Sequence, residues 1–172
     1  MSSEKDVLAE VVEQVNELIK VEDKGTLARL KRCVDKDYDL SVLSETFGWR
    51  YYTWAEDVIN VCVPYMAAHR KHVSGLHFVS AWKKLADQSN NEKPYDNKLR
   101  MLVKCNSVDQ FENQFSGMVR QLTNAGIGFD WRVLMGDVSW WLFSGKDEGM
   151  TVIKKWIRLY WGQKNNFEQV ID

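Results

Sequence analysis

Apolar residues recur at steps of three and four positions along almost the whole chain. That spacing gathers them on one face of an α-helix, whereas a strand that buries one face alternates apolar and polar residues with a period of two. No segment of this sequence shows a convincing alternation of that kind. The sequence therefore predicts an all-α fold class.

The chain begins with two expected helices. The first opens near Ser3, carries a narrow apolar stripe over residues 7–19 and is expected to end at Gly25. A short basic helix follows it, with Leu27 and Leu30 facing inward. The apolar stripes of both helices predict that they pack against a common core.

The next expected helix carries two local signals. Thr53 and Glu56 have the spacing of a capping box, in which a hydroxyl and a carboxylate bind the unpaired amides of the first turn. Trp54 starts an apolar face that continues to Met66, so this helix is expected to be buried. Pro64 removes one hydrogen bond inside it, at a cost of about 3 kcal/mol, and predicts a kink or a junction there.

A polar stretch at residues 87–94 is the best candidate for a linker between two parts of the chain. Four further helices are expected beyond it, one of which begins with a capping box at Ser107. The apolar side chains expected to face inward from the last helix are Met150, Ile153, Trp156, Ile157 and Tyr160. The predicted organisation is two small helical bundles packed together, over residues 1–90 and 91–172.

The bulk composition is that of an ordinary globular protein. At 172 residues, 45% of them hydrophobic, the chain can bury a core without a disulfide or a metal. The three cysteines, Cys33, Cys62 and Cys105, are scattered and fit reduced thiols. The acidic N-terminus does not have the pattern of a signal peptide, and no apolar run approaches the roughly 20 residues that a membrane span needs. We therefore expect a soluble cytoplasmic protein with no membrane association.

Three histidines are the candidates for a metal site. His69 and His72 lie one helical turn apart, but neither His77 nor a cysteine at suitable spacing supplies an obvious third ligand. A polar helix end is the better interpretation of this pair, because such groups offset the helix dipole. We expect no metal and no cofactor.

Catalytic motifs are also missing. Asp57, Asp130 and Asp137 lie beside apolar residues, but nothing indicates that two of them converge on one cleft, as a hydrolase needs. Asp130 directly precedes Trp131 and is better interpreted as a helix N-cap. The phosphate-loop, dinucleotide and nucleophile-elbow patterns are absent from the sequence. These observations argue against an enzyme.

Charge is distributed unevenly although the net charge is only −1. Residues 1–25 hold seven acidic and three basic residues, a net charge of −4. Residues 69–104 hold eight basic and three acidic residues, a net charge of +5. Because the local field decides what a surface attracts, the second stretch is the one suited to phosphate.

Two further features bear on nucleic-acid binding. Arg100 and Lys104 lie four residues apart on one helix face, and Lys154 and Arg158 repeat that relation, although a solvated helix face also explains either pair. Exposed tryptophans can stack on bases, but most of the eight have the spacing of core residues. The core set is Trp54, Trp82, Trp131, Trp141 and Trp156, whereas Trp49, Trp140 and Trp161 are less constrained.

Several short motifs follow one another in a distinctive order. They are Phe47-Gly48-Trp49, Ser80-Ala81-Trp82-Lys83-Lys84-Leu85, Leu99-Arg100-Met101-Leu102-Val103-Lys104, Arg120-Gln121-Leu122, Phe129-Asp130-Trp131 and Ser139-Trp140-Trp141. In this order they resemble the CasB family, the small subunit of the type I-E CRISPR Cascade complex. The resemblance runs from near Gly25 to Trp161.

The resemblance implies an all-helical, non-catalytic subunit that works beside other Cascade subunits and a second copy of itself. Family members contact the backbone assembly of the complex, which holds the guide RNA. They also line a basic path for target DNA and thereby stabilise the opened R-loop. The basic positions that match the family pattern are Lys83, Lys84, Lys98, Lys104 and Arg120, with Arg29 and Arg32 matched less securely. Arg100 joins these candidate nucleic-acid-binding residues because it lies in the same basic stretch.

The chain departs from the family pattern in two ways. It has single arginines, as at Arg120, where family members tend to carry pairs, and its first helix is acidic. Its own grip on free nucleic acid is therefore expected to be weak. The alternative interpretation is a helical protein–protein adaptor with no nucleic-acid role, which uses the surface at Trp49-Arg50-Tyr51-Tyr52.

Overall fold

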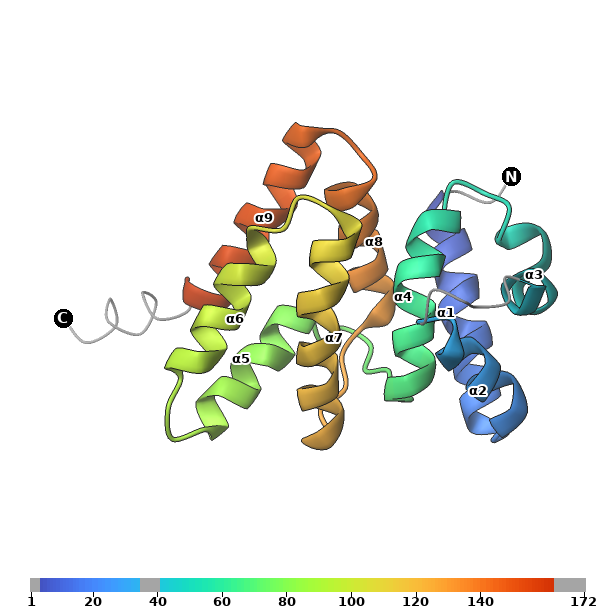
Figure 1. The fold of residues 1–172 in the computed structure, drawn as a ribbon, viewed down its shortest axis with the longest axis horizontal. Coiled ribbons are helices and arrows are strands. Elements are labelled where there is room, and N and C mark those ends of the chain that lie inside the picture. The colour runs from blue at the N-terminus through green and yellow to red at the C-terminus, as the bar shows by residue number, and fades with distance from the viewer. Residues whose placement is uncertain (1–3, 35–40, 163–172) are drawn as a thin grey trace.

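The computed structural model describes residues 4–34 and 41–162, and these residues form helices without a β-strand (Figure 1). The elements are α1 (Glu4–Lys20), α2 (Lys24–Arg32), α3 (Ser41–Phe47), the 3-10 helix η1 (Gly48–Arg50), α4 (Glu56–His69), α5 (Phe78–Gln88), α6 (Lys93–Val103), α7 (Val108–Asn124), α8 (Trp131–Leu142) and α9 (Lys146–Trp161). The predicted all-α fold class is confirmed. Within the described ranges, none of the helices is long and apolar enough to cross a membrane.

The helices form two groups that share one core. Figure 1 shows α1–α4 on one side of the molecule and α5–α9 on the other. The groups meet where α4 packs against α7 and α8, and where α1 packs against α8. One continuous cluster of buried apolar side chains runs through both groups. The arrangement is thus two small helical bundles packed together.

The position of the boundary between the two groups depends on α5. This helix packs against α6, α7 and α9, all of which follow it in the chain. The polar stretch proposed as a linker is partly helical, because α5 ends at Gln88 and α6 begins at Lys93. The division near Asn90 stays a prediction, and residues 70–77 are the alternative boundary that the packing of α5 favours.

The segment between α4 and α5 is fastened to the start of α8. The Val73 amide donates to the Phe129 carbonyl at 3.0 Å, and the Asp130 amide donates to the Leu76 carbonyl at 2.6 Å. At Gly128 the two segments are very close. A Cβ atom there would lie 2.7 Å from a Lys71 side-chain carbon, so only glycine fits without displacing the Lys71 side chain. We call this contact between residues 70–77 and 127–131 the crossing.

Two helix N-caps that the sequence predicts are confirmed. Ser107 begins α7 and accepts a hydrogen bond from the Gln110 amide at 3.3 Å. Asp130 begins α8 and accepts from the Arg132 and Val133 amides at 3.0 and 3.2 Å. The second carboxylate oxygen of Asp130 accepts from the Gly75 amide at 2.8 Å, so the cap of α8 also belongs to the crossing.

The expected end of the first helix is wrong. α1 ends at Lys20, whereas Gly25 lies in the first turn of α2; Ser3, the expected start, lies outside the described residues. Glu22 adopts a left-handed φ of 55°, its amide donates to Ile19, and the next amide donates to Leu18. This pair of hydrogen bonds is a Schellman motif, which closes a helix at a residue with positive φ that is usually glycine.

The expected capping box at Thr53 is also wrong. α4 begins at Glu56, and the Thr53 hydroxyl instead donates to the Arg50 carbonyl at 2.8 Å within the preceding turn. Trp54 lies in that turn with 42% of its surface exposed, so it does not belong to the core. α4 continues through Pro64 to its end at His69, and no junction divides it.

Four of the five predicted core tryptophans, Trp82, Trp131, Trp141 and Trp156, are buried. In the last helix, however, the buried face is rotated relative to the prediction. Trp156 and Tyr160 are buried, but Met150 and Ile157 are exposed and Val152 takes their place in the core. α8 packs along one side of α9, and this contact selects which edge of the apolar stripe faces inward.

Replacing Asp130 is expected to destabilise the fold. Asp130→Ala removes the cap of α8 and leaves the Gly75 amide without its acceptor, for a combined loss of about 2 kcal/mol in the free energy of unfolding. Asp130→Asn, which keeps one acceptor oxygen, should lose less. Urea unfolding measures both, with Asp57→Ala as the control, since that exposed first-turn carboxylate contributes below about 1 kcal/mol. Equal losses for the two alanine variants would contradict the capping role.

Candidate nucleic-acid interface

The basic face of α6 results from a simple division of the helix. Leu99 and Leu102 are buried in the core, and Pro94 occupies the first turn, where a missing amide costs nothing. The positions of α6 that do not face the core hold most of its basic residues. Lys98 is half-buried, whereas Arg100 and the C-cap residue Lys104 are exposed.

Arg100 is held in place by an aromatic ring. Its guanidinium carbon lies 4.9 Å from the centroid of the Trp161 ring on α9. Such a contact orients the guanidinium plane while its N–H groups stay available to an anion. Arg100 is therefore a preorganised cation, and Trp161 contributes through it.

Lys83 has a different environment from the other candidates. Its side chain is buried, with 8% of the residue exposed. The ammonium lies 2.7 Å from Asp87, 3.9 Å from Glu92 and 5.3 Å from the centroid of the Tyr160 ring. These partners fix Lys83 inside the bundle, whereas the next residue, Lys84, is exposed.

Arg120 lies on α7, the helix that packs beside α6. It is exposed, and it is separated from the first residue of α7 by about 18 Å of helix rise at 1.5 Å per residue. Lys104 lies at the opposite end of α7, in the turn that joins α6 to it. The candidate cations therefore form an extended face and do not converge on one point.

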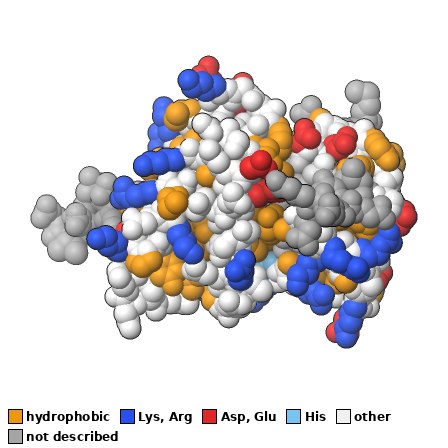
Figure 2. All heavy atoms as spheres, viewed as in Figure 1, with side chains coloured by type: hydrophobic (Ala, Val, Ile, Leu, Met, Phe, Trp, Pro, Cys, Tyr) orange, Lys and Arg blue, Asp and Glu red, His pale blue; other side chains and the backbone are white. Residues whose placement is uncertain are grey.

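α9 adds two exposed cations to the same side of the molecule. Lys154 and Arg158 are exposed, with Ile157 exposed between them. Lys155 is directed elsewhere, because its ammonium binds the Asp137 carboxylate on α8 at 2.9 Å. Figure 2 shows basic side chains gathered over α6 and α9, with hydrophobic side chains among them.

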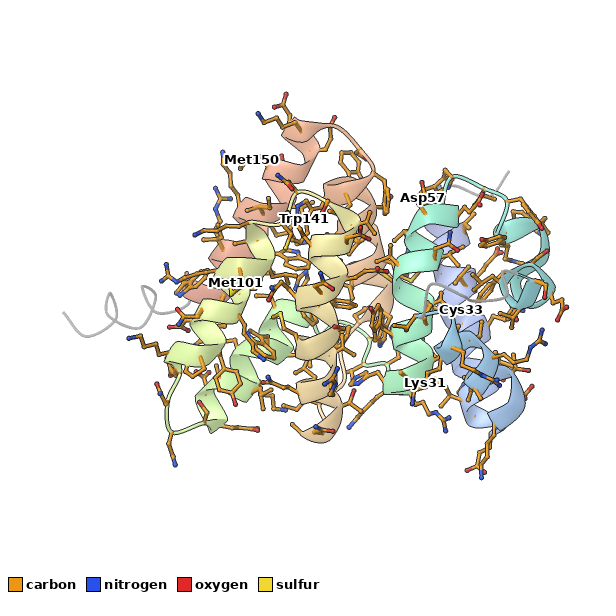
Figure 3. The ribbon with its side chains drawn as sticks, in the orientation of Figure 1. Lys31, Cys33, Asp57, Met101, Trp141 and Met150 are labelled. Atoms are coloured by element: carbon orange, nitrogen blue, oxygen red, sulfur yellow. The ribbon has the colours of Figure 1, made fainter. Side chains whose placement is uncertain are left out.

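A second basic area lies over α2 and the end of α4 (Figure 2). Arg29 is exposed and pairs with Glu45 at 3.1 Å, and Arg32 is exposed on the same helix. Figure 3 places Lys31 beside the end of α4, which is followed by Arg70 and Lys71. Arg70 and Lys71 are not among the residues predicted to bind nucleic acid, although both belong to the stretch with the +5 charge.

His69 is a buried neutral histidine. Its Nδ1 is 2.6 Å from the Thr123 hydroxyl, its ring stacks on Phe129, and its Nε2 is buried without a hydrogen-bond partner. Burial lowers the pKa of His69 to about 4, and the nearby charge of Lys71 acts in the same direction. The ring belongs to the packing between α4 and α7.

The other two histidines are engaged by separate partners. His72 Nδ1 accepts from the Trp131 amide at 3.2 Å, within the crossing. His77 Nδ1 accepts from the Val79 amide at 3.0 Å and caps α5, while its Nε2 is 2.8 Å from Asp137. Across residues 4–34 and 41–162, no group of three or more acidic, histidine or cysteine side chains is arranged to hold a metal.

Asp137 is the centre of a saturated network. Burial alone would raise its pKa, but hydrogen bonds from His77, Lys155 and Trp156 hold the pKa of this carboxylate below its usual value. Both ring nitrogens of His77 are already engaged, so this histidine is not available as a general base. The three aspartates singled out by the sequence are placed apart, at the starts of α4 and α8 and within α8.

The structure also contains an acidic hollow that the sequence did not predict. It has a volume of about 230 Å³ between α1 and the crossing, and its acidic residues are Glu13, Glu17 and Asp130. Asp130 is committed to backbone amides, and Glu17 binds Lys20 at 3.0 Å. These pairings leave Glu13 as the acid of the hollow without an assigned partner among the described residues.

The fold and its exposed cations define a class: a small all-helical protein with basic faces suited to a polyanion. A family model described as CRISPR-associated protein Cse2 matches residues 26–163. The chain belongs to this family of CRISPR Cascade subunits.

A solved structure supports the fold. The crystal structure of CasB from Thermobifida fusca matches with a TM-score of 0.73 and 18% sequence identity, over 90% of this chain and 97% of that chain. At this identity the similarity establishes the shared fold. No match was found among curated protein sequences.

The buried His69 predicts a loss of stability in mild acid. Its pKa is about 4 when folded and 6.5 in the reference state, so its contribution is complete above pH 6.5 and is lost as the pH falls toward 4. Between pH 7.5 and 5 the loss is about 2 kcal/mol in the free energy of unfolding. Urea unfolding at the two pH values measures it, and His69→Leu should be less sensitive to pH by that amount. The same pH dependence in wild type and variant would contradict the assignment.

Proposed function

We propose that this protein is the non-catalytic small subunit of a type I-E CRISPR RNA-guided surveillance complex, Cascade. In this role it contacts the backbone of guide RNA or target DNA and stabilises the R-loop in antiviral defence. It acts in the cytoplasm beside other Cascade subunits and a second copy of itself. The single observation that carries the proposal is the family match over residues 26–163.

The exposed cations support a contact with phosphate. Lys84, Lys98, Lys104 and Arg120 make no ion pair with a described residue, and Arg100 is oriented by Trp161. We leave Lys83 out of the proposed contact because its ammonium is buried and already paired. The second basic area, with Arg29 and Arg32, is a separate candidate surface at the opposite end of the face shown in Figure 2.

Weak contacts suffice for the proposed role. Exchange between a DNA duplex and an RNA–DNA heteroduplex is nearly balanced in free energy, so a few backbone contacts shift it. A net charge of −1 makes tight binding of the isolated chain to nucleic acid unfavourable. The chain is thus expected to act on nucleic acid within the assembled complex.

The aromatic surface at residues 49–54 supports contacts with other proteins. Trp49 is 56% exposed and Tyr52 is 68% exposed, whereas Tyr51 is buried and its hydroxyl donates to Asn60. The next exposed residues, Glu56 and Asp57, are acidic and unsuited to phosphate. This surface therefore favours contact with a neighbouring protein subunit. The protein–protein contact of the adaptor interpretation is thus kept as part of the proposal.

Removing two of the proposed phosphate contacts should change the salt dependence of target binding. Each contact to a single strand contributes about −0.7 to the slope of log K against log salt, so Lys104→Ala with Arg120→Ala should make the slope shallower by roughly 1.4. The measurement is target-DNA affinity of the reconstituted complex across a salt series.

The control for this experiment is Lys24→Ala, which removes an exposed lysine at the start of α2. Folding should be unaffected in the double variant, because both side chains lie off the buried face. An unchanged slope in a complex that still contains the variant would place the nucleic-acid path elsewhere, with Lys154 and Arg158 as the next residues to change.

No turnover is expected from the purified chain. Single- and double-stranded DNA and RNA should remain intact after incubation with magnesium or zinc, because we assign the protein no catalytic residue. Gel electrophoresis of labelled substrates checks this. Metal-dependent cleavage that disappears in Asp57→Ala or Asp130→Asn would overturn the non-catalytic assignment.

A further inference from the structure

A shallow hollow of about 320 Å³ lies between α6 and α7, beside the proposed phosphate contacts. Its lining residues are Met101, Lys104, Cys105, Gln110, Asn113 and Gln114. Met101 is 54% exposed, and Figure 3 shows it on the outer side of α6. The hollow thus combines an exposed apolar side chain, a cation and three amides within one surface.

Two of the three amides are free to bind a ligand. The Gln110 side chain is occupied, because its oxygen accepts from the Asn106 amide at 3.1 Å and helps to cap α7. The side chains of Asn113 and Gln114 make no hydrogen bond with any described residue. Both side chains line the hollow, and each carries a donor and an acceptor.

The floor of the hollow is apolar and rigid. Cys105 is buried there as a thiol, since burial raises its pKa, and its Sγ donates to the Met101 carbonyl at 3.3 Å. Phe111, which follows the lining residue Gln110 on α7, is completely buried in the core. A polarizable methionine sulfur contacts aromatic rings favourably, so Met101 suits the face or edge of a planar ring.

We infer that this hollow binds an unpaired nucleobase of the displaced DNA strand. The amides of Asn113 and Gln114 hydrogen-bond to the edge of the base, in the way that these side chains read base edges elsewhere. Met101 contacts the ring, and Lys104 binds the adjoining phosphate. The inference rests on the proposed function and deepens it, because it adds a base-binding site to the phosphate contacts.

The charge around the hollow favours a nucleotide over a basic peptide. Residues 93–104, on the α6 side, hold four basic residues and one acidic residue, a net charge of +3, whereas residues 105–114, on the α7 side, add the acids Asp109 and Glu112 and leave a net charge of +1 over both sides. Lys104 itself lines the hollow, whereas neither Asp nor Glu does. A planar ligand with hydrogen-bonding edges and an attached anion matches all of these features.

The test separates base binding from phosphate binding. Reconstituted complexes are offered an R-loop whose displaced strand carries either normal bases or an abasic tract with its phosphates intact. Wild type should bind the base-bearing strand about 10-fold more tightly, since a good pair of amide hydrogen bonds to a base edge contributes about that factor. In Asn113→Ala with Gln114→Ala, this preference should disappear while the slope of log K against log salt stays unchanged.

Matched controls identify the cause of any change. Asn124→Ala with Gln88→Ala removes two exposed amides that do not line the hollow and should keep the 10-fold preference. The thermal unfolding midpoint should be the same in both double variants, because the altered side chains are not buried. Met101→Ala is a second variant of the hollow and should also reduce the preference.

The inference and the proposed function fail in different ways. Equal binding of base-bearing and abasic strands by wild type, or a full preference retained without Asn113 and Gln114, overturns the base site. A shallower salt slope in Lys104→Ala with Arg120→Ala would then still support the proposed function. A wild-type chain that does not enter the complex overturns both.

Discussion

The crossing holds the two helix groups in one arrangement. Backbone hydrogen bonds join Val73 to Phe129 and Asp130 to Leu76, and the Asp130 carboxylate adds the Gly75 amide and the first amides of α8. Because α8 packs against α1, α4 and α9, its starting point decides where both groups lie. The position of α7, and with it the face that carries Arg120, depends on the same contact through α4.

Much of the fold was predictable because helical periodicity is a local property. The sequence indicated the all-α class, the caps at Ser107 and Asp130, and four buried tryptophans. It failed where tertiary contacts choose between similar local options. Glu22 takes the left-handed position expected of Gly25, and α8 determines that Met150 and Ile157 face outward although they extend the apolar stripe.

The candidate site was less predictable than the fold. Sequence identifies a basic residue but not its partners, so Lys83 and Lys84 looked equivalent although only Lys83 is buried against Asp87 and Tyr160. The amides of Asn113 and Gln114 gave no signal at all, since their freedom depends on what α6 leaves uncovered. The family match indicates a Cascade subunit, and the geometry separates the paired cations from the available ones.

The contact of α1 with α8 also has a consequence for synthesis of the chain. Some 110 residues separate the end of α1 from the start of α8, and α5 likewise packs against α9, a helix made much later. Neither group can bury all of its apolar surface until the later helices have left the ribosome, because α1 needs α8 and α5 needs α9. Folding is therefore completed only after α8 and α9 have emerged, and the part of the apolar face of α1 that packs against α8 stays uncovered until then.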